Sequence, residues 1–351
     1  MKPKQNSKPS KRLLIKLGTL CNLNCPHCHQ VQKSFKEHPR LLEWIKEEGF
    51  NRITFSGGEP LMYFDIIKRY MEYLGQDVHY RMMSNGTLLT KEIAEFFNKF
   101  EKVSYSVSYD GKCGGRDLEV PIQWGNLKHF NRGFGLCTIF SKPDFSYREF
   151  AKDVKSVFET NDLKHSVDHE FFKINWIHQT KDAPNEDFTQ DVADEYIKQT
   201  TRQLDHALYC YSIGELDETI VLNLFGRWYD KPKFQHGTKC CNEKLVCVNL
   251  DGTMMRCPYG GKEEIIGTID NPPSDEVYDS FIPERCKTCE HWEICRCECV
   301  ASVTALDCYV NRTMIPIVRD LIKKYELNEK IDELFRNPNP RFRSGRLRKS
   351  K

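Results

Sequence analysis

Three cysteines lie close together near the start of the chain, and their spacing could hold a metal centre. Cys21, Cys25 and Cys28 form a C-x3-C-x2-C pattern, which places three thiols on one short segment. Thiolates are soft ligands that select zinc, copper(I) or iron–sulfur clusters. A closed zinc site needs four ligands, and His29 could supply the last one. Three thiolates alone suit a [4Fe–4S] cluster with one open iron, so the segment predicts either zinc or iron–sulfur.

A second group of cysteines lies in the C-terminal third of the sequence. Its members are Cys241, Cys257, Cys286, Cys289, Cys295, Cys299 and Cys308, with Gly252 between the first two. The pair Cys286 and Cys289 has two residues between its members, which on its own is typical of a zinc knuckle. From spacing alone, this group therefore allows both a zinc ribbon and iron–sulfur ligation.

The composition is that of an ordinary globular protein, with 29% charged and 39% hydrophobic residues. No apolar run reaches the roughly 18 residues that suggest a membrane span. The basic N-terminus is not followed by the apolar segment of a signal peptide. We therefore expect a cytoplasmic protein without membrane contacts. In that reducing compartment, the 16 cysteines are expected to be metal ligands or free thiols and not disulfides.

Three further short motifs each follow a β-rich run. Ser56–Pro60 is Ser-Gly-Gly-Glu-Pro, Met83–Thr87 is Met-Ser-Asn-Gly-Thr, and Ser108–Gly111 is Ser-Tyr-Asp-Gly. Glycine pairs let a backbone approach a ligand closely. Because the carboxyl ends of parallel strands meet at one edge of a sheet, we expect these motifs to converge with the Cys21–Cys28 segment on one face.

An alternation of strands and helices between residues 12 and about 208 must position these motifs. The predicted strands are Arg12–Leu17, Arg52–Phe55, His79–Met83, Val103–Val107, Phe134–Phe140 and Glu170–Ile177. The predicted helices are Pro39–Glu48, Phe64–Leu74, Lys91–Phe100, Tyr147–Glu159 and Asp191–Leu208. This alternation is typical of a parallel sheet with helical crossovers. A last helix is predicted over Met314–Leu327, extending toward Phe335.

The motifs in this order resemble those of the radical S-adenosylmethionine (SAM) enzymes. The second cysteine group resembles their SPASM extension, which usually holds two auxiliary [4Fe–4S] clusters. The resemblance implies an α/β fold, in which a partial (β/α)6 radical SAM barrel is followed by a small cysteine-rich SPASM domain. The expected divisions are a basic arm at 1–11, the barrel with a connecting helix at 12–234, the SPASM domain at 235–315, a helix at 316–335 and a basic tail at 336–351.

The resemblance also implies which residues form the SAM site. Cys21, Cys25 and Cys28 would hold the cluster at which SAM is cleaved reductively to a 5′-deoxyadenosyl radical. Contacts to SAM would come from His27, Gly57, Gly58, Glu59, Pro60, Asn85 and Ser108. Among these, His27 would lie near the adenine, and Glu59 would bind the amino group.

Two auxiliary clusters follow from the same resemblance. Cys286, Cys289, Cys295 and Cys308 would hold one of them, and Cys241, Cys257 and Cys299 would hold the other. The fourth ligand of the latter would be Cys240 or Cys210, or its iron would be open to substrate. Sulfatase-maturating members of the family carry an aspartate after the Cys257 position, where this chain has Pro258. That departure weakens the interpretation as a sulfatase maturase.

The implied reaction is hydrogen abstraction from a carbon of a macromolecular substrate, and peptide crosslinking, epimerisation or oxidation is favoured. Radical isomerisation of an amino-acid-modified base in viral DNA is one alternative, and a small-molecule dehydrogenase is another. Cys113, in a glycine-rich loop, would return a hydrogen atom in an isomerisation. A flavodoxin- or ferredoxin-like protein is the implied one-electron reductant.

Two basic arms could contact an anionic peptide or nucleic acid. Residues 1–12 carry five cations and residues 336–351 carry seven, with no acid in either arm, although the net charge of the chain is only +2. Such arms are typical of proteins that contact polyanions, and they are also typical of solvated tails. Both interpretations remain open from the sequence.

Overall fold

The computed structural model describes residues 11–28, 32–116, 119–140, 142, 144–163, 174–176, 189–216, 224, 228–229, 245–256, 264–274, 286, 288–295 and 305–336. The strands are β1 (Arg12–Lys16), β2 (Arg52–Ser56), β3 (His79–Ser84), β4 (Val103–Ser108), β5 (Gly135–Phe140), β6 (Ile174–Trp176), β7 (Leu245–Asn249), β8 (Thr253–Met255) and β9 (Ile265–Thr268). The helices are α1 (Leu41–Glu47), the 3-10 helix η1 (Pro60–Tyr63), α2 (Phe64–Leu74), α3 (Lys91–Asn98), α4 (Trp124–Leu127), α5 (Tyr147–Thr160), α6 (Gln190–Ser212), α11 (Trp292–Cys295), α12 (Ala305–Lys324) and α13 (Asn328–Arg336). The predicted ligands Cys240, Cys241, Cys257 and Cys299 lie outside the described residues, as do residues 1–10 and 337–351 of the basic arms.

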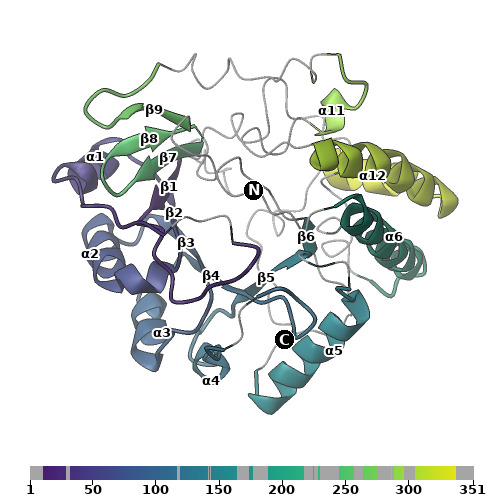
Figure 1. Ribbon diagram of the computed structural model, residues 1–351, viewed down its shortest axis with the longest axis horizontal. Coiled ribbons are helices and arrows are strands. Elements are labelled where there is room, and N and C mark those ends of the chain that lie inside the picture. The colour runs from purple at the N-terminus through teal and green to yellow at the C-terminus, as the bar shows by residue number, and fades with distance from the viewer. Residues whose placement is uncertain are drawn as a thin grey trace, which may run out of the picture.

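A nine-stranded sheet organises the described part of the chain, in the order β6-β5-β4-β3-β2-β1-β7-β8-β9. Each pair of neighbours from β1 to β6 is parallel. Helices α1 to α6 form an outer ring around these strands (Figure 1). The predicted α/β fold with a partial (β/α)6 barrel is therefore confirmed. It brings the carboxyl ends of β1, β2, β3 and β4 to one edge.

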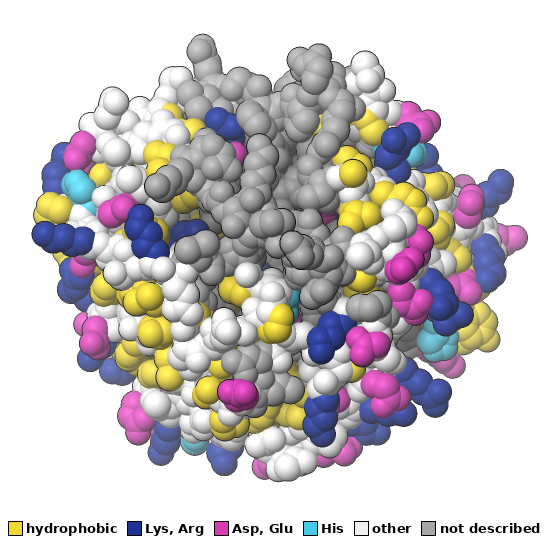
Figure 2. Space-filling view, in the orientation of Figure 1, with side chains coloured by type: hydrophobic (Ala, Val, Ile, Leu, Met, Phe, Trp, Pro, Cys, Tyr) yellow, Lys and Arg dark blue, Asp and Glu magenta, His cyan; other side chains and the backbone are white. Residues whose placement is uncertain are grey.

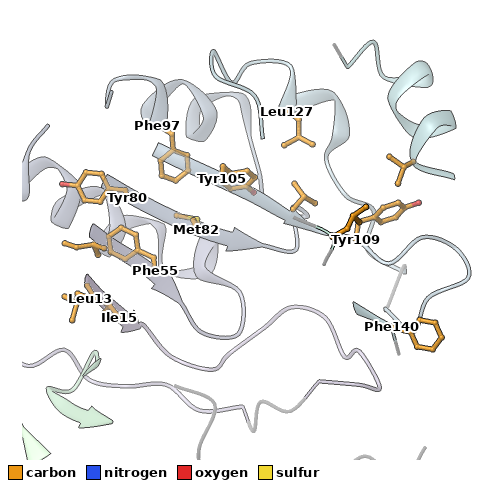
Figure 3. Packing of buried hydrophobic residues seen from close by; sticks show 14 of the residues in the cluster. Leu13, Ile15, Phe55, Tyr80, Met82, Phe97, Tyr105, Tyr109, Leu127 and Phe140 are labelled. Carbon is orange, nitrogen blue, oxygen red and sulfur yellow. The ribbon is translucent and has the colours of Figure 1, made fainter. Parts of the chain in front are cut away.

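The main core lies between the parallel strands and the helices. Leu13 and Ile15 of β1, Phe55 of β2 and Met82 of β3 point into this layer, together with Phe97 of α3 (Figure 3). All five side chains are 0–2% exposed, so the sheet is anchored where the strands lead to the predicted motifs. Burial of such large apolar side chains stabilises the fold by about 1.5–3 kcal/mol each.

Strand β7 extends the barrel sheet from the opposite side of β1. It pairs with β1 in parallel, from Arg12 opposite Leu245 to Lys16 opposite Asn249. Strands β8 and β9 then follow in antiparallel pairing. Strand β1 therefore has a paired strand on each side, and its Leu14 packs with Cys247 in a second small core. The region expected to begin the SPASM domain thus shares the sheet of the barrel.

The turn between β7 and β8 also contacts the segment that precedes α1. Gly252 in this turn has φ +82°, and a Cβ atom there would lie 3.0 Å from Cγ of His38. The His38 backbone N–H donates to the Leu250 carbonyl at 2.9 Å, and His38 Nε2 lies 3.1 Å from Oδ2 of Asp270. Gly252 therefore meets both a positive φ and a close neighbour, which accounts for the glycine between Cys241 and Cys257.

The C-terminal helix begins earlier than the sequence analysis predicts. The prediction was a helix from Met314, whereas α12 begins at Ala305 and includes both Cys308 and Pro316. The chain then turns at Glu326, with φ +56°, before α13. Helix α12 packs on α6, and Asp205 accepts hydrogen bonds from the Lys324 ammonium at 2.7 Å and the Tyr325 hydroxyl at 2.8 Å. The predicted start was wrong because apolar residues at helical spacing continue back to Leu306.

The face of the molecule seen in Figure 2 is mixed in charge. Acidic and basic side chains alternate around its rim, including the part over α5, α6 and α12 (Figure 2). In the described ranges, no helix has the length and apolar character needed to cross a bilayer.

Candidate active site

The segment that follows β1 carries the first three cysteines at the carboxyl edge of the sheet. Cys21 and Cys25 are half-buried and Cys28 is exposed. The Cys28 backbone N–H donates to the Cys25 carbonyl at 2.9 Å, which forms a tight turn. The described residues contain no group of three or more His, Cys, Asp or Glu side chains gathered as metal ligands. The three thiols lie on one loop at this edge of the sheet.

The environment of Cys21 disfavours the thiolate in the absence of a bound cation. Burial raises the pKa of the Cys21 thiol, and the nearby charges of Glu59 and Cys28 raise it further. Its Sγ accepts a hydrogen bond from the Leu23 backbone N–H at 3.4 Å. A thiolate here is stabilised by positive charge, which a bound iron cluster would supply. Three soft thiols on one loop, one of them exposed, are a donor set that suits a [4Fe–4S] cluster with an open iron.

The two glycines after β2 are required by contacts within the chain. A Cβ atom on Gly58 would lie 2.2 Å from the Leu20 carbonyl oxygen, and one on Gly57 would lie 2.1 Å from that of Gly18. The Gly58 backbone N–H donates to the Gly18 carbonyl at 3.0 Å, and that of Glu59 donates to Leu20 at 2.9 Å. The sequence analysis assigned these glycines to an approach toward SAM. The structure shows that they admit the backbone leading to Cys21.

Glu59 joins the ends of β2 and β3. Its side chain is 0% exposed. Oε1 accepts hydrogen bonds from the Leu61 N–H at 2.9 Å and the Ser84 hydroxyl at 2.8 Å, and Oε2 accepts from the Asn85 N–H at 2.7 Å. Burial raises the pKa of this carboxyl, and the three hydrogen bonds oppose the rise. The contact of Glu59 with the SAM amino group remains a prediction.

Asn85 connects the end of β3 to the cysteine loop. Its Nδ2 donates to Asn22 Oδ1 at 2.9 Å and to Cys21 Sγ at 3.7 Å. The Asn22 amide in turn donates to the Thr87 hydroxyl at 2.8 Å. The structure therefore brings the motifs Ser56–Pro60 and Met83–Thr87 together with the cysteine segment, as the parallel topology requires.

His27 is held against the end of β4. Its side chain is 7% exposed, and its Nε2 lies 3.6 Å from Oδ2 of Asp110, which is fully buried. Arg116 Nη2 lies 3.3 Å from the same oxygen, while Oδ1 of Asp110 accepts from the Ile139 N–H at 2.9 Å. Burial lowers the pKa of His27, although Asp110 opposes this. The ring is therefore neutral near pH 7, and Arg116 is the cation that balances the Asp110 charge.

This balance leads to a prediction about Arg116. Arg116→Gln leaves the Asp110 carboxylate buried without its cation, which is expected to cost about 3–5 kcal/mol of unfolding free energy. Adding Asp110→Asn removes the stranded charge and keeps the acceptor for Ile139, so the double variant is expected to be more stable than Arg116→Gln alone. Urea denaturation of the wild type and of the two variants measures both effects. A loss below about 1 kcal/mol in Arg116→Gln, the range of exposed ion pairs, would contradict the assignment.

Cys113 lies on the side of its loop that faces α5. Its Sγ donates to the Ser146 carbonyl at 3.7 Å, and the residue packs against the main core. Burial raises the pKa of its thiol. These contacts give Cys113 a packing role. The role of Cys113 as a hydrogen-atom donor stays a prediction.

Four of the predicted auxiliary-cluster ligands are described, and they lie on or near two helices. Cys286 is 8% exposed, and its carbonyl accepts from the Cys289 N–H at 3.3 Å, just before α11. Cys295 ends α11, and Cys308 lies in the first turn of α12, which contacts α11. Their ligation of one cluster remains a prediction.

The sequence motifs did not identify three residues of the site. Gly18 has no room for a side chain, because a Cβ atom there would lie 2.0 Å from the Tyr63 hydroxyl oxygen. Asn22 is one of the unspecified residues between the first two cysteines of the C-x3-C-x2-C pattern. Arg116 ends the glycine-rich loop, where only Cys113 was considered. The one available signal was the glycine directly after the first strand, since glycine there often marks a close backbone approach.

Comparison with known proteins agrees with this geometry. Residues 15–111 match the Radical SAM superfamily. An uncharacterized protein of Methanocaldococcus jannaschii is 27% identical over 166 residues, which are 40% of this chain and 57% of that protein. The serine-type anaerobic sulfatase-maturating enzyme of Bacteroides thetaiotaomicron is 25% identical over 84% of this chain and 83% of its own length.

A solved structure shares the fold over nearly the whole chain. It is native anSMEcpe with bound AdoMet, which is SAM, and the Kp18Cys peptide. Its TM-score is 0.63 at 19% identity, and the match covers 91% of this chain and 99% of that one. The likeness therefore extends beyond the barrel into the C-terminal cysteine-rich region.

Proposed function

Since residues 15–111 match the Radical SAM superfamily, we propose that this chain is a radical SAM enzyme that modifies a peptide by hydrogen abstraction from one of its carbons. The observation that carries this proposal is the extent of the likeness. Similarity to the Bacteroides maturating enzyme runs through 84% of the chain and takes in the C-terminal region, not the barrel alone. The solved structure with a similar fold contains both bound SAM and a peptide. A substrate of the same chemical class fits a chain with the same organisation.

The cysteine loop and the strand ends would bind different groups at the site. Cys21, Cys25 and Cys28 would hold the [4Fe–4S] cluster, which supplies the electron for reductive cleavage of SAM to methionine and a 5′-deoxyadenosyl radical. Contacts to SAM would come from His27, Gly57, Gly58, Glu59, Pro60 and Ser108. A flavodoxin- or ferredoxin-like protein would supply the electron.

The C-terminal region would provide two more clusters. One would be held by Cys286, Cys289, Cys295 and Cys308, and the other by Cys241, Cys257 and Cys299. A hydrogen taken from a peptide leaves a carbon radical, which must lose an electron to give a crosslinked or oxidised product. Auxiliary clusters could accept that electron. If the product is an epimer, Cys113 would instead return a hydrogen atom to the carbon.

Anaerobic incubation with candidate peptides tests this proposal. When SAM and dithionite are present, we expect synthetic copies of short peptides encoded beside the gene to be modified. An oxidised or crosslinked peptide loses two hydrogens. An epimerised peptide exchanges one carbon-bound hydrogen for deuterium from deuterated solvent and is otherwise unchanged in composition. Tandem mass spectrometry locates the modified residue. Modification of a nucleic-acid base or of a small molecule, with every such peptide left unchanged, would favour the alternative substrates.

A further inference from the structure

The Asn85 side chain is the polar group whose contacts bear most directly on the cysteine loop. The residue is 6% exposed, and both ends of its carboxamide have partners. Oδ1 accepts from the Thr87 backbone N–H at 3.0 Å and from the Thr87 hydroxyl at 2.8 Å. Nδ2 donates to Asn22 Oδ1 at 2.9 Å and to Cys21 Sγ at 3.7 Å.

These partners determine which way the amide faces. Its oxygen meets the Thr87 backbone N–H, which can only donate, so a flipped amide would bring two N–H donors together. The orientation of an asparagine amide is assigned from such a network. The N–H group of Asn85 is therefore the end that faces the Cys21 sulfur.

The backbone of Asn85 is held independently of its side chain. Its N–H donates to Oε2 of the buried Glu59 at 2.7 Å. One residue thus lies between a buried carboxylate and the sulfur of Cys21. A carboxylate near a cluster disfavours an added electron, and an N–H donor at a cluster sulfur favours it, because the reduced cluster is the more negative form.

We propose that Asn85 sets the reduction potential of the iron–sulfur cluster through its N–H···S hydrogen bond to Cys21. This inference rests on the proposed function, because it needs the cluster at Cys21, Cys25 and Cys28. Asn85 is then a positioning and tuning residue, in contrast to the SAM contact that the sequence resemblance implies. Partners beyond the metal ligands commonly tune a metal centre in this way.

The test is an EPR-monitored redox titration of the reconstituted protein with dithionite, first without SAM. Asn85→Ala removes the donor, so its cluster is expected to be harder to reduce. At the wild-type midpoint potential, we expect the ratio of reduced to oxidised cluster in Asn85→Ala to be about tenfold lower than in the wild type. For one electron, this corresponds to a midpoint potential about 59 mV more negative. Asn85→Asp keeps the size of the side chain and adds a negative charge, so its midpoint is expected to fall at least as far.

Asn126→Ala is the matched control. Its Nδ2 donates to the Leu89 carbonyl at 2.9 Å, so it removes the same chemical group from a bond to a backbone oxygen. We expect the midpoint of this variant to equal that of the wild type. SAM affinity, measured by the change in the EPR spectrum during SAM titration, is expected to stay within about twofold of the wild type in both Asn85 variants, a difference near 0.4 kcal/mol.

The outcomes separate this inference from the proposed function. If wild-type protein binds no iron–sulfur cluster, the proposed function fails. If the cluster forms and both Asn85 variants keep the wild-type midpoint, the proposal for Asn85 is wrong and the function stands. An unchanged midpoint with much weaker SAM binding would instead make Asn85 a SAM contact. If Asn85→Ala assembles no cluster, the midpoint potential of Asn85→Asp decides. A lower value than in the wild type supports the proposal, and the wild-type value contradicts it.

Discussion

Replacement of Cys21, Cys25 and Cys28 together with alanine is expected to abolish 5′-deoxyadenosine formation from SAM. The three thiols lie on one loop after β1, and they are the proposed ligands of the cluster that cleaves SAM. Without a reducible cluster no electron reaches SAM, so the loss should be complete and not graded. Liquid chromatography with mass spectrometry measures 5′-deoxyadenosine after anaerobic incubation with dithionite.

Cys247→Ala is the control for this experiment. Cys247 is 2% exposed in β7 and packs with Leu14 and Met255, so its replacement trims a core without touching the loop. The expected cost is about 1 kcal/mol of stability, near that of one buried methylene group. The variant should still cleave SAM. Cleavage by the triple-alanine variant at the control's rate would place the reactive centre elsewhere.

Gly58→Ala is expected to disrupt the cysteine loop from a neighbouring strand. Its new Cβ atom would lie 2.2 Å from the Leu20 carbonyl oxygen and 2.4 Å from that of Thr19, and neither backbone atom can rotate away. Overpacking of this kind costs about 1–3 kcal/mol, occasionally more. Because Cys21 follows Leu20 directly, the shift should also reduce iron bound at the loop. Urea denaturation and iron analysis measure the two effects.

Gly125→Ala provides the comparison for Gly58→Ala. A Cβ atom on Gly125 in α4 meets nothing within 4 Å. Alanine is preferred over glycine inside a helix by about 1 kcal/mol, so this variant is expected to be as stable as the wild type or slightly more so. Equal iron content in the Gly58 and Gly125 variants would show that the loop tolerates the added methyl group.

The barrel was predictable because each strand carries its own local signal. Helix α2 was predicted with both ends correct, and α5 within one residue, since their apolar residues recur at helical spacing and glycine or asparagine follows them. The convergence of Asn85 with Cys21 followed from topology alone, because parallel strands end on one edge.

Other features depend on contacts between segments that are distant in the sequence. The parallel pairing of β7 with β1 joins residues more than 200 positions apart, and no local pattern indicates it. The packing of Gly57 and Gly58 against the backbone of Gly18–Leu20 could not be read from the motif, because it joins the ends of two strands. The contact of these glycines with SAM remains a prediction. The ion pair of Arg116 with Asp110 escaped notice because a motif marks residue types and not the cation that balances them.

Deuterium transfer tests the central claim, radical chemistry on a peptide, most directly. Wild-type protein is incubated anaerobically with SAM, dithionite and a peptide deuterated at its carbons, and 5′-deoxyadenosine is analysed by mass spectrometry. We predict that 5′-deoxyadenosine carries deuterium from the peptide, and that the modified peptide forms with it. Formation of 5′-deoxyadenosine without deuterium from any such peptide, together with deuterium transfer from a labelled nucleic acid or small molecule, would contradict the account.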